Sequence, residues 1–174
     1  QMAIKSAGFS TSTTAVVDLT RFKPPDASRR CVAHNAGKMY MTQLTEGRAT
    51  DALVSGFGNV CETKMYGNPT VMTQSYDLRE LQGGDSWAKM VSKLIADQQI
   101  SDPETILSRY SMQSMQPPNY AEAWSLTEAL AAGTAQFETI THLMRDGTKP
   151  MQAIEETYKI NNQTLFRKWV ESAK

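Results

Sequence analysis

The chain has 174 residues, which is enough for one domain with a sizeable hydrophobic core. Its 18 basic and 18 acidic side chains balance, and the longest basic run is short, so charge favours neither nucleic acid nor an anionic membrane surface as a partner. No apolar stretch approaches the roughly 20 residues that a transmembrane segment needs.

The N-terminal region predicts a small β element. Gln1 ahead of Met2 indicates that residues 1–2 are a tag remnant, and no signal peptide is visible. A β-branched run from Ala15 to Leu19 predicts a strand, for which Gly8-Phe9 would supply the partner arm. We therefore expect the β element within residues 3–22, before the turn at Lys23-Pro24-Pro25.

Two helices are expected next. Asp26 or Ser28 would cap the first, which runs to about Leu44, and Gly47 interrupts the pattern. A second helix follows from Ala49 to Met65. Together these helices occupy residues 28–66.

Residues 70–174 are predicted to be a helical portion, irregular up to residue 85. Ser86 and Asp102 are expected caps, and Pro117-Pro118 is expected to break the chain. The expected helices begin near residues 87, 103, 120, 137, 150 and 165, and three tryptophans on them, Trp87, Trp124 and Trp169, are expected core anchors.

The two cysteines, Cys31 and Cys61, leave the redox state open. One disulfide would suit an exported protein, and two buried thiols would suit a cytosolic one. Cys31 and His34 share a helix face, so with Cys61 they could form a rebuilt metal or nucleophilic site. A further ligand is lacking, because His142 lies far along the chain.

The segment His34-Asn35-Ala36-Gly37-Lys38 lies inside a predicted helix. A zinc-peptidase helix carries His-Glu-x-x-His, in which two histidines bind one metal and the glutamate acts as general base. Here only the first histidine remains. Taken alone, these five residues also suit an ordinary helix with a solvated lysine.

Further segments around this motif occur in a recognisable order. They are residues 7–18, 32–38, 53–62 and, towards the C-terminus, 120–126, 137–147 and 169–170. In this order the chain resembles the peptidase MA-like gluzincins, which are thermolysin-like zinc metallopeptidases, and in particular a bacterial branch of secreted or envelope domains. The match extends from about Gly8 to Trp169.

The resemblance implies an α+β, mostly α-helical fold: a gluzincin-like metalloprotease catalytic domain with a small N-terminal β element and a helical C-terminal portion. Residues 3–174 would then form a single domain, with 3–22 as the β element, 28–66 as the degenerate motif helices and 70–174 as the helical portion. Most of the N-terminal sheet that such domains carry has no counterpart in the sequence.

Carried over by position, the first zinc ligand is His34, the base position holds Asn35, the second ligand position holds Lys38 and the third holds Ser55. An amide has no useful basicity, an ammonium repels a dication, and a hydroxyl is a poor zinc ligand. The resemblance therefore implies a site with no catalytic residue, no metal and no cofactor.

The expected function is that of a pseudopeptidase, a catalytically inactive metallopeptidase-like domain that binds or scaffolds an unidentified protein or peptide. One alternative is a hydrolase with a site reorganised around His34, Cys31 and Cys61. Another is a helical interaction domain without peptidase ancestry. An exported or cell-envelope location is favoured slightly over the cytoplasm.

Overall fold

The computed structural model describes residues 8–10, 15–17, 25–69 and 86–173, with side chains from residue 29 onward. Four predictions lie wholly or partly outside these residues: the tag remnant at residues 1–2, the strand end at Asp18-Leu19, the turn at Lys23-Pro24-Pro25 and the irregular stretch 70–85. The described elements are strands β1 (Gly8–Ser10) and β2 (Ala15–Val17), followed by helices α1 (Pro25–Leu44), α2 (Asp51–Tyr66), α4 (Trp87–Ala96), α5 (Pro103–Arg109), α6 (Pro117–Ala131), α7 (Thr134–Arg145), α8 (Pro150–Tyr158) and α9 (Asn162–Ser172).

The described part of the chain is helical, and the predicted α+β gluzincin-like fold is wrong. The strands β1 and β2 have three residues each and pair only with one another among the described residues, antiparallel, with Phe9 opposite Val16. A ribbon of this size forms no sheet layer that could cover helices or supply one side of a core. The strand pattern placed the two short strands correctly, but only the family resemblance made them part of an α+β gluzincin-like fold.

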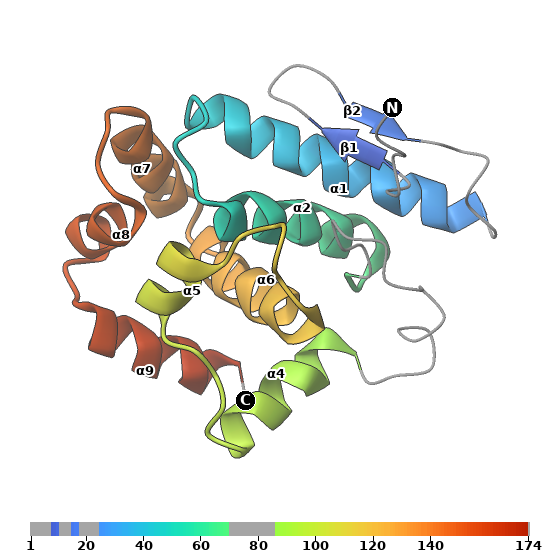
Figure 1. Cartoon of the computed structure of the whole chain (residues 1–174). Coiled ribbons are helices and arrows are strands. Elements are labelled where there is room, and N and C mark those ends of the chain that lie inside the picture. The colour runs from blue at the N-terminus through green and yellow to red at the C-terminus, as the bar shows by residue number, and fades with distance from the viewer. Residues whose placement is uncertain (1–7, 11–14, 18–24, 70–85, 174) are drawn as a thin grey trace.

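Three helices form the middle of the molecule, with α2 between α1 and α6 (Figure 1). Glycines allow both contacts. A Cβ atom on Gly37 would lie 2.8 Å from Cys61 Sγ and 3.0 Å from Gly58 Cα, so α1 and α2 approach closely there. A Cβ atom on Gly56 would overlap Thr127 and Ala123 of α6. Because α1 and α6 cover two sides of α2, its polar residues Ser55, Asn59 and Glu62 are buried.

Aromatic residues anchor the outer helices on α6. Trp87 of α4 packs edge-on against Trp124 of α6, with ring centroids 6.2 Å apart. On α9, Trp169 is buried and its indole Nε1 donates a hydrogen bond to Ser125 Oγ at 3.0 Å. All three tryptophans are buried, which confirms their prediction as core anchors.

Caps and prolines define the helix starts. Ser86 Oγ accepts a hydrogen bond from Lys89 N, and Asp102 accepts one from Thr105 N, as the sequence predicted for α4 and α5. Pro117-Pro118 was expected to break the chain, but these two residues open α6. Proline is tolerated in a first helical turn because the N–H group that it lacks has no partner there.

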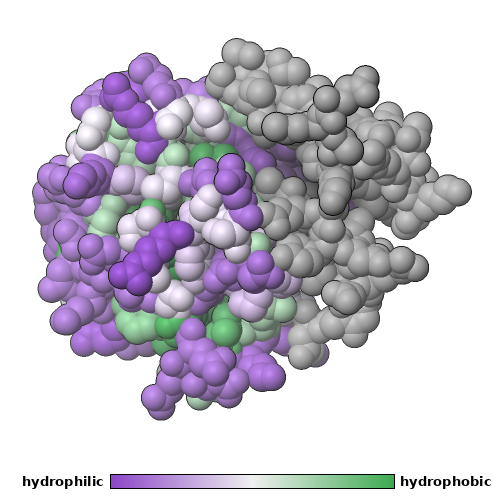
Figure 2. Space-filling model, viewed as in Figure 1, coloured by the Kyte–Doolittle hydropathy of each residue, from purple (hydrophilic) through white to green (hydrophobic). Residues whose placement is uncertain are grey.

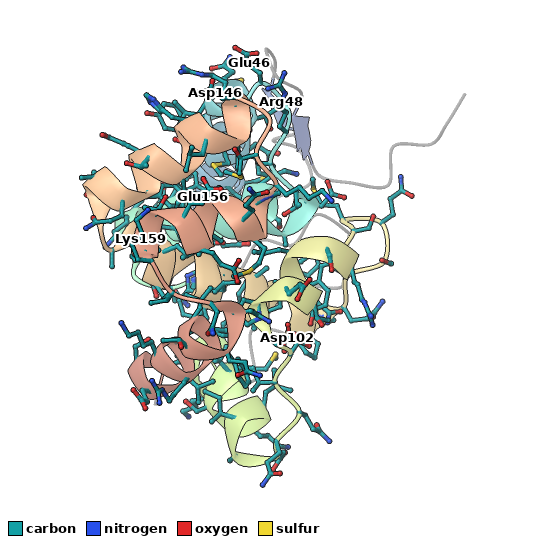
Figure 3. All side chains as sticks on the ribbon, turned by 90° about the vertical axis from the view of Figure 1, so that its left-hand side faces the viewer. Glu46, Arg48, Asp102, Asp146, Glu156 and Lys159 are labelled. Atoms are coloured by element: carbon teal, nitrogen blue, oxygen red, sulfur yellow. The ribbon has the colours of Figure 1, made fainter. Side chains whose placement is uncertain are left out.

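Side-chain hydrogen bonds join segments that are distant in sequence, and two of the residues that form them, Arg48 and Asp102, are labelled in Figure 3. Arg48, in the loop between α1 and α2, donates to the carbonyl of Arg145 at the end of α7. Asp102 also accepts a hydrogen bond from Asn162 Nδ2 of α9 at 3.2 Å, which fixes α9 to the start of α5.

Within the described ranges, no helix has both the length and the apolar character needed to span a bilayer. The face shown in Figure 2 carries mostly hydrophilic side chains, with apolar residues in separate small patches. Most of the larger apolar side chains are collected in one core formed by the helices, whereas Val32, Tyr40 and Met65 are exposed.

Candidate functional site

The four predicted site residues are all buried, three of them on α1 and Ser55 on α2, and these two helices are in contact. Arg30 Nη1 of α1 lies 3.2 Å from Glu62 Oε1 of α2, and a Cβ on Gly58 would lie 2.7 Å from His34 O and 2.9 Å from Lys38 Cγ. Later residues of α1 therefore meet earlier residues of α2, so the two helices are antiparallel. Ser55 lies about one helical turn before Gly58 on α2.

We call this region the α1–α2 polar layer: Cys31, His34, Asn35 and Lys38 from α1 with Ser55 and Glu62 from α2. All six residues are buried. The four residues of α1 are spaced at three or four positions, which places them on neighbouring strips of one helix face. Apolar residues with this spacing are common where one helix packs against another. The unusual feature here is that the buried residues are polar.

His34 is 1% exposed, and neither ring nitrogen has a hydrogen-bond partner among the described residues. Burial, with a smaller contribution from the charge of Lys38, lowers the pKa of His34 from 6.5 to about 3. The imidazole is therefore neutral near pH 7. It has one N–H donor and one lone pair, and both are unused.

Asn35 is buried and fully oriented by its own helix. Its Nδ2 donates to Cys31 O at 2.9 Å and approaches Cys31 Sγ at 3.2 Å. The amide thus bonds back to the preceding helical turn, which is a common role for a short polar side chain inside a helix. It cannot accept a proton from water.

Lys38 is 6% exposed and forms no ion pair within the part of the chain that the structure describes. Burial lowers the pKa of Lys38, while the charges of Asp51 and Cys31 raise it by smaller amounts. The ammonium is therefore held in surroundings that stabilise it less than water does.

Ser55 is fully buried, and its hydroxyl has no partner among the described residues. Buried hydroxyl groups are normally hydrogen-bonded, because leaving one unpaired costs about 1–3 kcal/mol. Ser55 and His34 thus provide three buried polar atoms in one layer that the described side chains leave unsatisfied.

Glu62 is a buried carboxylate that the sequence did not single out as a site residue. Arg30 binds it at 3.2 Å, stacks over the Tyr66 ring at 5.0 Å and donates to Asn68 O at 2.8 Å. These contacts connect the start of α1 to the end of α2. Because Arg30 neutralises it, Glu62 is poorly suited to replace the missing general base. The sequence carried no signal for it, because Asn59 and Ser55, which precede it by one and two turns, are also polar.

A second buried carboxylate, Glu122 of α6, also escaped the sequence analysis. It accepts hydrogen bonds from Ser101 N at 2.7 Å and from Tyr110 Oη, and Ser101 Oγ contacts the same phenol at 2.8 Å. Burial and the bond to Glu122 raise the pKa of Tyr110 to about 12. The phenol stays protonated as a donor, so this network fixes the loop before α5 onto α6.

The cysteines do not support the reorganised site. Cys31 and Cys61 are free thiols, and burial raises the pKa of each, which disfavours the nucleophilic thiolate. Neither sulfur is hydrogen-bonded to His34, and His142 is exposed on α7. Among the described residues, no three His, Cys, Asp or Glu side chains are grouped so that they could hold a metal.

Comparison with known proteins identifies no relative: no family model matches the chain, and neither a curated protein nor a solved structure shows significant similarity to it. The interpretation of the α1–α2 polar layer therefore depends on its own chemistry.

Proposed function

We propose that this chain is a non-catalytic domain that works by binding or scaffolding a protein or peptide, and that its α1–α2 pair descends from the motif helices of a zinc peptidase. One observation carries the proposal. The positions that correspond to two zinc ligands and the general base are buried in the α1–α2 pair, where they hold Lys38, Ser55 and Asn35, and both His34 and Lys38 lie against Gly58 of α2.

Peptide hydrolysis by the zinc-peptidase mechanism needs a metal-activated water and a carboxylate base. Lys38 puts an ammonium where a dication would bind. Asn35 has a neutral amide, whose Nδ2 already donates a hydrogen bond to Cys31 O. A cysteine hydrolase is also disfavoured, because both thiols have raised pKa values and no hydrogen bond to His34. These properties favour a binding role over either form of catalysis.

The first prediction concerns metal and activity. The purified full chain, after exposure to zinc and removal of loosely bound metal, is expected to contain far less than one zinc per molecule. It is also expected to show no turnover of casein or of a fluorogenic peptide mixture, with a thermolysin-like enzyme as positive control. Stoichiometric zinc together with metal-dependent cleavage would refute the non-catalytic proposal.

The second prediction tests ancestry by rebuilding the site. The triple variant Asn35→Glu, Lys38→His, Ser55→Glu is expected to bind zinc with one-to-one stoichiometry, because it places two imidazoles and a carboxylate in one layer. The matched control adds His34→Ala to the same triple variant and should lose that binding. Zinc is also expected to raise the melting temperature of the triple variant alone.

A triple variant that is folded by circular dichroism but binds zinc no better than its His34→Ala control would contradict the ancestry. The helical interaction domain without peptidase descent would then be the better description. The milder double variant Asn35→Glu, Lys38→His keeps the buried Ser55 unchanged and serves if the triple variant does not fold.

A further inference from the structure

Helix α1 has an inverted distribution of polar and apolar side chains. Its buried residues include the four that it contributes to the α1–α2 polar layer. Its exposed side is apolar instead: Val32 and Tyr40 are 50% and 53% exposed, and Ala36 is exposed between them. Residues four apart lie on the same face of a helix, so these three form one stripe. We call Val32, Ala36 and Tyr40 the outer stripe of α1.

No described helix covers the outer stripe. Helix α1 lies at the edge of the helical body, with α2 on its inner side (Figure 1). It also contacts strands β1 and β2, and the stripe residues remain exposed beside them. A surface helix normally turns its apolar face towards the core, and grouped exposed apolar residues mark interaction surfaces.

An aromatic column holds Tyr40 in place. Its ring stacks on Phe57 of α2, with centroids 6.1 Å apart and an interplanar angle of 26°, and Phe57 stacks on Phe137 of α7 at 5.5 Å. Phe137 is buried, so the column extends from the core to the surface. Tyrosine is enriched among the residues that dominate interfaces, and a side chain that is already ordered loses little entropy on binding.

The two ends of the outer stripe carry opposite charges. Arg29 lies on α1 three residues before Val32, and Glu46 follows the last residue of α1 by two positions. Both side chains are exposed, and neither forms an ion pair within the described ranges. Glu46 lies at the top edge of the molecule in Figure 3. The exposed residues of α1 between these two charges are uncharged.

We propose that the outer stripe docks on α1 of a second copy of this chain, in an antiparallel two-fold contact. An axis between positions 37 and 38 places Arg29 of each copy opposite Glu46 of the other. The same axis places Tyr40 of each copy between Val32 and Ala36 of the other, where the small alanine leaves room for the ring. This contact does not depend on the proposed function of the α1–α2 pair.

The charges select this occupant. In a two-fold contact the same surface serves both copies, so it must be complementary to itself. A stripe with a cation at one end and an anion at the other meets this condition when the helices are antiparallel. A parallel contact would instead place Arg29 against Arg29 and Glu46 against Glu46, which is unfavourable.

The dimer is expected to be weak, because a contact between two single helices is small. Stable protein interfaces bury about 1,200–2,000 Å² in total, and a stripe of three apolar side chains falls at the low end of that range or below it. We therefore expect a dissociation constant of about 10–100 μM. Sedimentation equilibrium of the full chain between about 1 and about 500 μM covers this range.

Three variants of the stripe test the contact. Tyr40→Ser is expected to weaken dimerisation about tenfold or more, because it removes the aromatic anchor. Arg29→Glu and Glu46→Arg should each weaken it by about tenfold as well, since each substitution places like charges opposite one another at both ends. Lys168→Glu reverses an exposed charge on α9, on the far side of the molecule (Figure 1), and should dimerise like the parent.

An equimolar mixture of the two charge variants is the decisive measurement. The Arg29→Glu chain has two acidic ends and the Glu46→Arg chain has two basic ends, so a mixed pair has opposite charges at both ends. We expect the mixture to associate about as tightly as the parent, although each variant alone does not. The double variant Arg29→Glu, Glu46→Arg should also dimerise like the parent.

Three results would overturn the proposal. A parent chain that stays monomeric at about 500 μM would mean that the outer stripe does not bind a second copy. Dimerisation that Tyr40→Ser and both charge variants leave unchanged would place the contact on another surface. Failure of the mixture to associate, with each variant weakened alone, would exclude the antiparallel arrangement.

Discussion

Lys38 shows how one residue can be buried at a cost. Its aliphatic stem lies against Gly58, and its ammonium keeps only a small exposed area. A lysine stem covers apolar surface well, but its charge loses hydration when it is enclosed. The lowered pKa of Lys38 is the consequence, because the fold favours the neutral amine more than water does.

Lys38→Met should therefore stabilise the protein at pH 7, because it removes the cost of burying the ammonium. The unfolded chain binds this proton more tightly, so the parent gains stability as the pH rises towards the ordinary lysine pKa near 10.5. The advantage of the variant should shrink over the same window. Urea unfolding from pH 7 to 10.5 measures both effects.

The control for this experiment is Lys64→Met, an exposed position where substitution should change stability by no more than about 0.5 kcal/mol. A Lys38→Met variant less stable than the parent at pH 7 would show that the lysine contributes favourable contacts that outweigh its desolvation.

At the scale of elements, glycines determine how closely α1 and α2 pack. Gly58 has no exceptional backbone conformation that only glycine could adopt, so its role is the missing side chain. The atoms that a Cβ would meet include His34 O, a backbone oxygen of a neighbouring helix that cannot move alone.

Gly58→Ala is expected to destabilise the protein by about 1–3 kcal/mol, because separating two helices costs more than the roughly 1 kcal/mol that alanine gains in helix propensity. The measurement is urea unfolding at pH 7. Gly133→Ala is the matched control, since its Cβ would meet mainly the flexible end of Gln136. Equal stability of Gly58→Ala and the parent would mean that the α1–α2 contact is looser than described.

The elements themselves were largely predictable from the sequence. Ser86 and Asp102 marked helix starts because a short polar side chain can satisfy the free N–H groups of a first turn. The role of Pro117-Pro118 was not predictable, because the same pair suits a break or a first turn. A first turn forms when the residues that follow the prolines pack into the core. Here Tyr120 is fully buried, so the prolines open the helix.

The candidate site was predictable only where position along a helix was enough. The gluzincin resemblance selected His34, Asn35, Lys38 and Ser55. The structure buries all four and places His34 and Lys38 against Gly58 of α2. Glu62 and Glu122 were missed because their partners, Arg30 and Tyr110, are chosen by tertiary packing. A buried carboxylate cannot be distinguished from a solvated one in a sequence that does not show its partner.

At the scale of the whole molecule, the helices share one core that runs from α2 through α6 to α9. The α1–α2 polar layer lies beside this core, so a charge change in the layer acts on the folding of the entire domain. Within this layer, protonation of His34 should affect the stability of the fold most strongly, because the side chain is buried and its pKa falls to about 3.

The pH dependence of stability follows from His34. The unfolded chain takes up a proton below pH 6.5, whereas the folded imidazole stays neutral to about pH 3, so this contribution is complete above pH 6.5 and is lost as the pH falls between these values. One proton corresponds to about 1.4 kcal/mol per pH unit. His34→Gln should therefore flatten urea-unfolding stability between pH 6.5 and 4.5, above the main carboxylate range. His142→Gln, at the exposed histidine, should keep the parent slope, and equal slopes in all three proteins would rule out His34 as the cause.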